Sequence, residues 1–177
     1  MKIRTDMLLI RRILFAVMIV VTAVCSATKG FVPQINGVSA FVLVPLVVSI
    51  ALFEKSVPSL IFGTFAGIMW DMYSVTADGF FSVLLSAAGF LTAIIILFYM
   101  RNNIATAVVL TFVWSLFIST MYWLNFILMP KTVSAFYIYL RYYLPSPFYT
   151  AVFTFVFYFI VKWIFEKTTP ERKRINY

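Results

Sequence analysis

A carboxylate stands in a stretch of apolar and small residues, where it could bind a cation, transfer a proton or hold a neighbouring helix. In residues 62–74, FGTFAGIMWDMYS, Gly63 and Gly67 are four positions apart, and Asp71 follows four positions later. A charge at the centre of a membrane helix costs about 2.5–3.5 kcal/mol on insertion scales, and less near the interface. Something must therefore offset the charge of Asp71. The sequence leaves two interpretations open, a structural hydrogen bond and a functional carboxylate in a cavity or partner contact.

The remaining side chains offer little further chemistry. The chain has no histidine, one cysteine (Cys25) and six carboxylates. The lack of histidine removes Ser-His and Cys-His dyads and histidine-ligated metal sites, and a single cysteine excludes an intrachain disulfide. We therefore expect a protein that is not an enzyme and that holds no metal or cofactor.

The composition predicts one integral membrane domain over residues 1–177. The chain is 63% hydrophobic and 11% charged, whereas soluble domains are about 45–50% apolar and about 25% charged. The net charge of +8 would suggest a nucleic-acid partner in a soluble protein. Here the basic residues lie mostly at the chain ends and in short loops, so they are expected to set orientation in the bilayer, with no nucleic acid bound.

A membrane helix needs about 20 apolar residues, and six such spans are predicted in one all-α bundle. They cover about 9–28, 38–53, 57–77, 80–100, 104–129 and 145–165. Arg11 and Arg12 are expected to snorkel from the cytoplasmic end of the first span. That span also resembles a signal peptide, with small residues at 25–27 in a cleavage-like spacing. We favour a retained helix.

The predicted third and fourth helices, about 57–77 and 80–100, each carry a stripe of small and polar residues at helical spacing. In membranes, small residues let helices approach closely, and the short connection between the third and fourth spans makes them antiparallel neighbours. Asp71 shares its stripe with the glycines, so it is expected to face protein and to hydrogen-bond to a neighbouring helix. Asp78 is expected to cap the fourth helix. The predicted packing or partner interface comprises Gly63, Gly67, Asp71, Ser74, Asp78, Gly79, Ser82, Ser86 and Gly89.

The segment SAFYIYLRYYLPSPF before the last span is crowded with tyrosines around a single arginine. It is predicted either to lie in the headgroup zone or to form a docking surface for an outer-face partner. The residues singled out are Tyr137, Tyr139, Arg141, Tyr142 and Tyr143.

The pattern Gly63-x3-Gly67-x3-Asp71-x2-Ser74-x4-Gly79, preceded by a neutral span that ends in Glu54-Lys55, resembles the MreD family of rod shape-determining proteins. Val75 and Asp78 depart from the family pattern. The resemblance implies a non-enzymatic scaffold of the peptidoglycan elongation machinery in the bacterial inner membrane. It implies MreC as the main partner, with MreB, RodA and the class B penicillin-binding transpeptidase in the wider complex. A homo-oligomer is also compatible with it.

The same resemblance implies a fold similar to the S component of energy-coupling-factor transporters, and this supplies the alternative function. An S component would bind a small molecule near the outer face, which needs several polar groups converging in a cavity. Asp71, Tyr122 and Asn125 are the candidates.

Both chain ends are predicted to be cytoplasmic. With six spans, eleven of the fourteen basic residues lie on the inner side and only Lys29, Lys131 and Arg141 lie outside, as the positive-inside rule expects. A reporter enzyme that is active only outside the membrane, fused after Tyr177, should be inactive. An active fusion would contradict the orientation.

Overall fold

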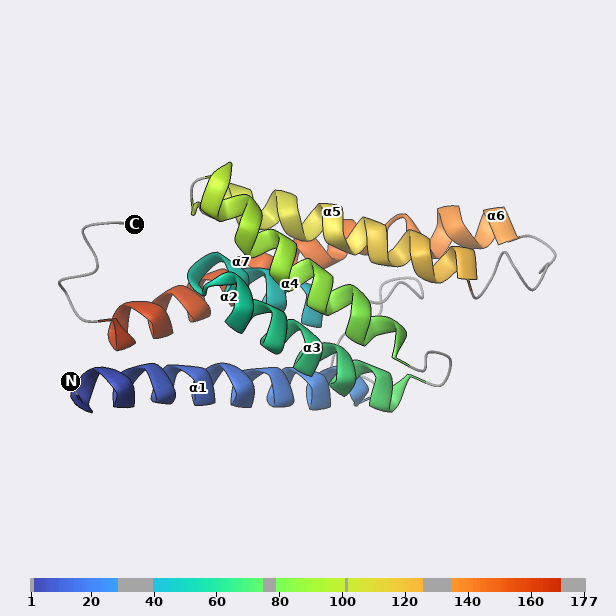
Figure 1. Cartoon of the computed structure of the whole chain (residues 1–177). Helices are drawn as coiled ribbons and strands as arrows, with labels where there is room; N and C mark the ends of the chain where they lie inside the picture. Colours follow the sequence, from blue (N-terminus) through green and yellow to red (C-terminus); the bar gives the residue numbers. More distant parts are fainter. Residues whose placement is uncertain (1, 29–39, 75–78, 101, 126–134, 170–177) are drawn as a thin grey trace.

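The computed structural model describes residues 2–28, 40–74, 79–100, 102–125 and 135–169, and this part of the chain is helical with no β-strand. The predicted all-α class is therefore confirmed. Figure 1 shows the elements in order. Their bounds are α1 Lys2–Ala27, α2 Leu43–Phe53, α3 Ser56–Tyr73, α4 Phe80–Phe98, α5 Ile104–Trp123, α6 Ala135–Ile138, the π-helical η2 Tyr139–Tyr143 and α7 Ser146–Thr168.

Within the described residues, four helical stretches are long and apolar enough to cross a membrane. They are Met7–Ala27, Phe80–Phe98, Ile104–Trp123 and Phe136–Thr168. This identifies a multi-pass membrane protein. The 18-residue α3 is not among the four, because its glycines, serines and Asp71 lower its hydropathy.

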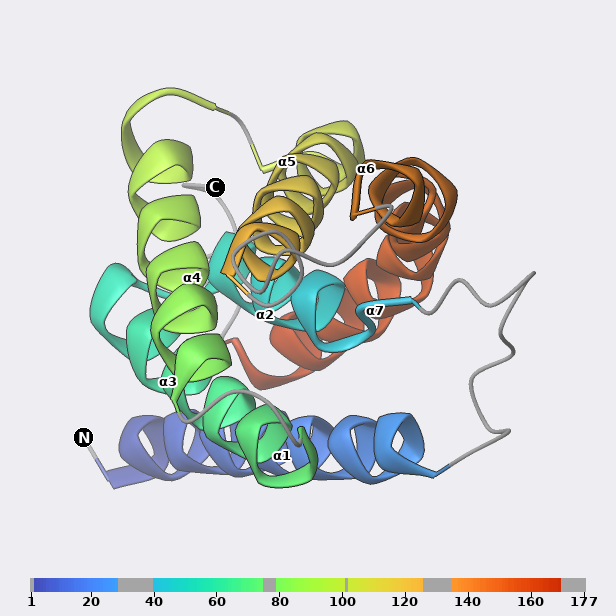
Figure 2. The same ribbon diagram turned by 90° about the vertical axis from the view of Figure 1, so that its right-hand side faces the viewer.

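Helix α2 forms the centre of the bundle. All ten residues from Leu43 to Leu52 are buried, and Figure 2 shows α2 enclosed by the longer helices, with contacts to α1, α3, α4, α5 and α7. A helix that is apolar on every side is stable only when it is surrounded. Its 11 residues span only about 16 Å at 1.5 Å per residue. The predicted second span was 38–53; its start at 38 lies outside the described residues, and the helix begins at Leu43.

The other predicted boundaries agree more closely. The first and last helices are longer than predicted, while the third and fifth end earlier, at Tyr73 and Trp123. The predicted ends at 77 and 129 lie outside the described residues. Pro147 lies in the first turn of α7, where the N–H that proline lacks would have no acceptor within the helix.

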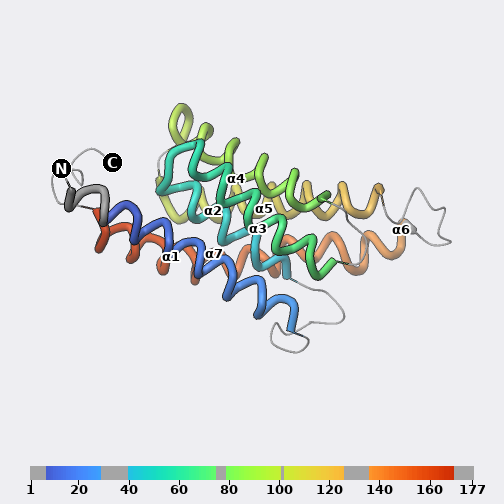
Figure 3. The backbone as a smooth tube through the Cα atoms, turned by 60° about the horizontal axis from the view of Figure 1, so that its bottom comes forward, coloured from blue at the N-terminus to red at the C-terminus, as the bar shows by residue number. Residues whose placement is uncertain are grey.

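Helix α1 is an integral part of the packed core. Phe15, Ile19 and Ala23 are buried against the bundle, while Ile13 and Val17 on the other side are exposed. The start of α1 and the end of α7 lie at the same end of the bundle, as Figures 1 and 3 show. This arrangement is the one required if both termini are on the same side of a membrane.

Arg11 does not snorkel, contrary to the sequence prediction. It is 7% exposed, and its Nε lies 2.7 Å from Oε1 of Glu54, directly after α2. Its guanidinium also lies 4.9 Å from the ring centre of Phe165 and donates to Thr169 Oγ1 at 3.4 Å. A buried carboxylate within reach offsets the desolvation of the arginine. Arg12, next in sequence, is exposed.

Breaking the Arg11–Glu54 pair should destabilise the protein more than removing it completely. Arg11→Met leaves the buried Glu54 carboxylate without an opposite charge, and Glu54→Gln does the same to the Arg11 guanidinium. We expect each variant to lower the free energy of unfolding by about 3 kcal/mol. The double variant Arg11→Met/Glu54→Gln should recover at least half of the summed loss. Thermal unfolding in detergent measures this, and additive losses would contradict a direct pair.

Candidate functional site

The two small-residue stripes pack directly against each other. A Cβ atom added at Gly63 would lie closer than 3.0 Å to the carbonyl oxygen of Leu85, and one added at Gly67 would lie equally close to the backbone of Ser82. On the other helix, a Cβ at Gly89 would meet the carbonyl oxygen of Ser59. Real Cβ atoms are not found at such distances, so only glycine fits at these three positions.

This register runs antiparallel, from Ser59 beside Gly89 to Gly67 beside Ser82. Of the two predicted roles of the stripe with Gly63 and Gly67, a packing face or a partner interface, the structure shows packing within the bundle against α4. Ser86 also belongs to this interface, because its Cα lies 3.0 Å from the Cβ position of Gly63. Gly63, Gly67 and Gly89 are buried within the chain, and Ser82 and Ser86 are half-buried, so the contact between α3 and α4 already occupies this face.

Asp71 closes the α3–α4 interface at its far end. Its Oδ1 accepts a hydrogen bond from the backbone N–H of Phe81 at 3.1 Å. Its Oδ2 accepts from the N–H of Ser82 at 3.0 Å and from the Ser82 hydroxyl at 2.5 Å. The first N–H groups of a helix have no acceptor within the helix, and the helix dipole favours an anion there. The prediction that Asp71 faces protein and hydrogen-bonds to a neighbouring helix is confirmed.

The cap of α4 differs from the prediction. The N-cap residue is Gly79, with φ +79° and no side-chain cap, and Asp78 lies outside the described residues. Gly79 was predicted to pack at the interface, yet a Cβ there would meet nothing within 4 Å. Glycine suits this position because of its backbone conformation, which residues with a Cβ rarely adopt. The carboxylate that replaces a side-chain cap comes from Asp71 on α3.

Ser74 also has a different role from the one predicted. It is the C-cap residue of α3, and its N–H donates to the carbonyl oxygens of Trp70 and Asp71. Its side chain lines a cavity rather than the α3–α4 interface.

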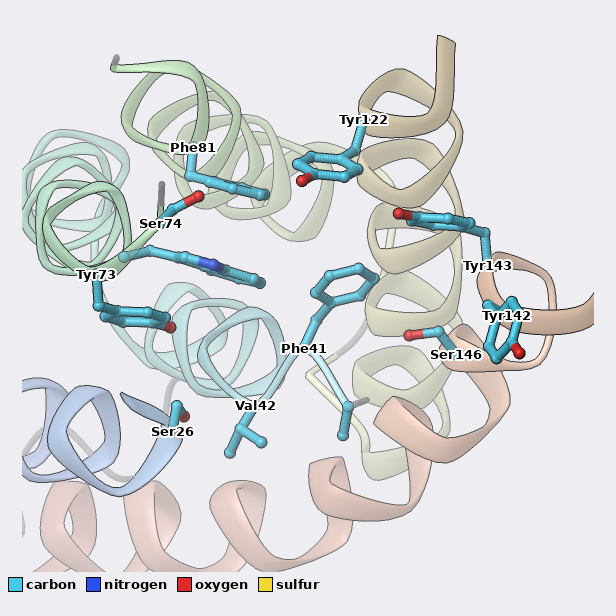
Figure 4. Close-up of a pocket in the computed structure, with 12 residues that line it drawn as sticks. Ser26, Phe41, Val42, Tyr73, Ser74, Phe81, Tyr122, Tyr142, Tyr143 and Ser146 are labelled. Atoms are coloured by element: carbon cyan, nitrogen blue, oxygen red, sulfur yellow. The ribbon is translucent and has the colours of Figure 1, made fainter. Parts of the chain in front are cut away.

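That cavity has a volume of about 450 Å³ and lies where α1, α3 and α5 end and α4 and α7 begin. We call it the aromatic cavity, because seven of its twelve lining residues carry rings. Figure 4 shows the wall formed by Phe81, Tyr122 and Tyr143. Trp70 immediately precedes Asp71 in the sequence. The Trp70 ring stacks on the Phe81 ring, with centroids 4.4 Å apart and planes at 7°. The carboxylate that binds the N–H of Phe81 thus also fixes the two rings at the cavity wall.

Two of the three groups predicted for a small-molecule site are elsewhere. Asp71 is occupied at the start of α4, and the Asn125 amide donates to the carbonyl oxygen of Met121 at 2.9 Å. Only Tyr122 lines the aromatic cavity. Among the described residues, no three His, Cys, Asp or Glu side chains form a group that could hold a metal ion.

The tyrosine-rich segment is helical rather than an irregular loop. Helix α6 and η2 lead into α7, and the three form one apolar helical stretch, Phe136–Thr168. The Tyr139 hydroxyl lies 3.0 Å from Thr120 Oγ1, and Ser119 donates to the carbonyl oxygen of Tyr143 at 2.9 Å, so one side of η2 is attached to α5.

The other side of the segment is open. Phe136 and Tyr137 are 68% and 57% exposed, and Arg141 is exposed too. The Arg141 guanidinium donates to the Tyr137 hydroxyl and lies 5.8 Å from the ring centre of Tyr142. Tyr142 and Tyr143 contribute to the aromatic cavity. The segment therefore combines an exposed side with residues of the cavity wall.

Sequence reasoning did not find Phe41, Trp70 and Phe81 as members of a site. Trp70 lies within the predicted motif and Phe81 follows it by two positions, but aromatic residues are so common in this chain, at 19%, that their types gave no signal.

Comparison with protein-family models, with curated proteins and with solved structures gives no match.

The close α3–α4 contact predicts that added bulk at Gly67 is destabilising. Gly67→Leu should lower the melting temperature in detergent strongly, because the backbone of α4 must move away. Should this variant fail to fold, Gly67→Ala provides the measurement. It should cost about 1–3 kcal/mol although alanine is the better helix former.

The matched control is Ala105→Leu, which adds bulk at an exposed position of α5 and should change little. A Gly67→Ala variant more stable than the parent would show that the helices are not in backbone contact.

The hydrogen bonds of Asp71 refine what its variants should do. From sequence, a structural role predicts that Asp71→Asn is tolerated. In the structure both carboxylate oxygens accept from backbone N–H groups, so the amide NH2 of asparagine would face a donor. We expect a graded loss of stability, largest for Asp71→Leu at about 2 kcal/mol or more, intermediate for Asp71→Asn and smallest for Ser82→Ala.

Thermal unfolding in detergent ranks the three variants. An asparagine variant that is as stable as the parent but inactive in cells would instead assign Asp71 a functional charge.

Proposed function

We propose that this chain is a non-enzymatic scaffold of the bacterial inner membrane, of the MreD type, which binds other membrane proteins of the peptidoglycan elongation machinery. The four long apolar helices and α3 then cross the bilayer, the shorter α2 enters it inside the bundle as part of the second span, and both termini are cytoplasmic. The architecture would be similar to that of the S component of energy-coupling-factor transporters. The motif that carries the family resemblance supports the proposal, since its residues build a tight pair of helices rather than a reactive site.

The observation that carries the proposal is the projecting α6–η2 segment. The stretch Phe136–Thr168 has 33 residues, which span about 50 Å at 1.5 Å per residue. This exceeds a hydrocarbon core of about 30 Å. In Figure 1, α6 lies beyond the ends of α3 and α4. A scaffold needs such a surface, one that is held by the bundle yet stays accessible.

The exposed residues of this segment are of the types that dominate protein interfaces. Tyrosine and arginine are enriched among interface residues that contribute most to binding. Tyr137 and Arg141 are exposed and hold each other through a hydrogen bond, so their positions are fixed before a partner arrives. Less side-chain entropy is then lost on binding. We assign the α6–η2 segment as the surface that contacts MreC.

The test is co-purification of MreC with the tagged chain after co-expression. We expect the parent to retain MreC and the double variant Tyr137→Ser/Arg141→Ser to retain at least tenfold less, since residues of this kind each contribute about 2 kcal/mol or more at interfaces.

The matched control is Arg12→Ser/Tyr99→Ser, which removes an exposed arginine and an exposed tyrosine away from α6 and η2. It should retain MreC as the parent does. No retention by the parent would contradict the scaffold. Equal retention by both double variants would contradict the assigned surface.

A further inference from the structure

The aromatic cavity has the size and the chemistry of a small-molecule site. Its volume of about 450 Å³ lies within the range of about 300–1,000 Å³ that is usual for ligand pockets. It is formed by residues from α1, α3, α4, α5, η2 and α7 together with residues 40–42. Such a site, with many ring faces and a few polar groups, is typical of binding pockets.

The wall of the cavity is a connected series of rings. Trp70 stacks on Phe81 at 4.4 Å, Phe81 on Tyr122 at 5.8 Å and Tyr122 on Tyr143 at 5.9 Å. Phe41 adds a tilted ring 5.3 Å from Trp70. Because each ring is held by the next, the wall is rigid, and a flat ligand can stack on it with little loss of conformational freedom.

Hydroxyl groups face the same space from opposite sides. Figure 4 shows the Tyr73 hydroxyl directed inward from α3, and the hydroxyls of Tyr143 and Ser146 directed inward from η2 and α7. A hydroxyl can both donate and accept a hydrogen bond. Ser26, on α1, already donates to the carbonyl oxygen of Thr22 at 2.8 Å, so its remaining capacity is to accept.

The lining carries no charge among the described residues. Asp71, adjacent in sequence to Trp70, is turned to the start of α4, and Arg141, next to Tyr142, donates to Tyr137. An anionic ligand would therefore lose its hydration without a cationic partner, and a metal ion would find no carboxylate. An acyl chain would fill the space but leave the inward hydroxyls of Tyr73 and Tyr143 facing a chain that cannot pair with them.

We propose that the aromatic cavity binds one uncharged small molecule that contains an aromatic ring and at least one hydrogen-bonding group. The ring stacks against the wall, and the polar group meets the hydroxyl of Tyr73 or that of Tyr143. This inference stands on the cavity alone and holds whether or not the chain binds MreC.

The test is binding of four naphthalene probes to the full chain in nanodiscs, with empty nanodiscs subtracted for partitioning into lipid. The probes are 2-naphthol, naphthalene, 2-naphthalenesulfonate and trimethyl(2-naphthylmethyl)ammonium. We expect saturable binding of one 2-naphthol per chain, with the other three bound at least tenfold more weakly.

Two neighbouring positions of α1 give a matched pair of variants. Ser26→Trp places an indole in the cavity, whereas Ala27→Trp adds the same side chain at an exposed position that does not line it. Only Ser26→Trp should abolish 2-naphthol binding. Tyr73→Phe removes a single hydroxyl and should weaken 2-naphthol binding about fivefold without changing the binding of naphthalene. This variant provides the test if Ser26→Trp does not fold.

Four results would overturn the proposal. These are no saturable binding above empty nanodiscs, equal loss in both tryptophan variants, equal binding of naphthalene and 2-naphthol, and a charged probe that binds as tightly as 2-naphthol. Equal binding of naphthalene would indicate an apolar slot for lipid, and preference for the ammonium probe would indicate an organic cation.

Discussion

The carboxylate of Asp71 on the backbone of α4 is the interaction on which the rest of this structure depends. It provides acceptors for two N–H groups that the helix itself cannot pair, and it also takes the hydroxyl of Ser82. In a membrane, an unpaired backbone group at this position would be costly, because water is not there to pair with it. The N–H groups at the start of α4 therefore offset the cost of burying the carboxylate, and the carboxylate offsets the cost of leaving those N–H groups unpaired.

The same bond connects the close helix contact to the aromatic cavity. Gly63 and Gly67 bring the backbones of α3 and α4 together, and Asp71 then sets their relative position along the axis. Trp70 and Phe81, adjacent to this bond, are stacked as a result, and the ring series continues through Tyr122 to Tyr143. A change at the start of α4 would thus reach both α5 and η2. The small-residue motif, the cavity wall and the base of the α6–η2 segment form one continuous piece of the fold.

Sequence alone predicted the part of this arrangement that follows from local periodicity. The stripes of α3 and α4 are spaced as helical faces, and a short connection makes them neighbours, so their packing and the protein-facing side chain of Asp71 could be inferred. Residues distant in sequence were harder to relate. Arg11 was expected to reach headgroups, because nothing in the sequence placed Glu54 beside it.

The aromatic cavity could not be predicted for the same reason. Its residues come from the ends of several helices at one side of the bundle, and each is an ordinary aromatic, serine or small apolar residue by type. Helix α2 was predicted as a full span because its sequence is a long apolar run. Such a run shows that the segment avoids water, but it does not show whether lipid or protein surrounds it. The tyrosine-rich segment likewise carries no signal that separates a helix attached to α5 from a segment in the headgroups.

The most direct measurement of the central interaction is amide hydrogen exchange at Phe81 and Ser82, followed residue by residue by NMR in nanodiscs. Amides in the first turn of a helix usually exchange faster than those in its middle, because they lack an acceptor within the helix. If the Asp71 carboxylate holds them, Phe81 and Ser82 should be as strongly protected as Leu85 in the interior of α4. Exchange at Phe81 and Ser82 that is many times faster than at Leu85 would show that the carboxylate does not bind the start of α4, and would contradict this account of the fold.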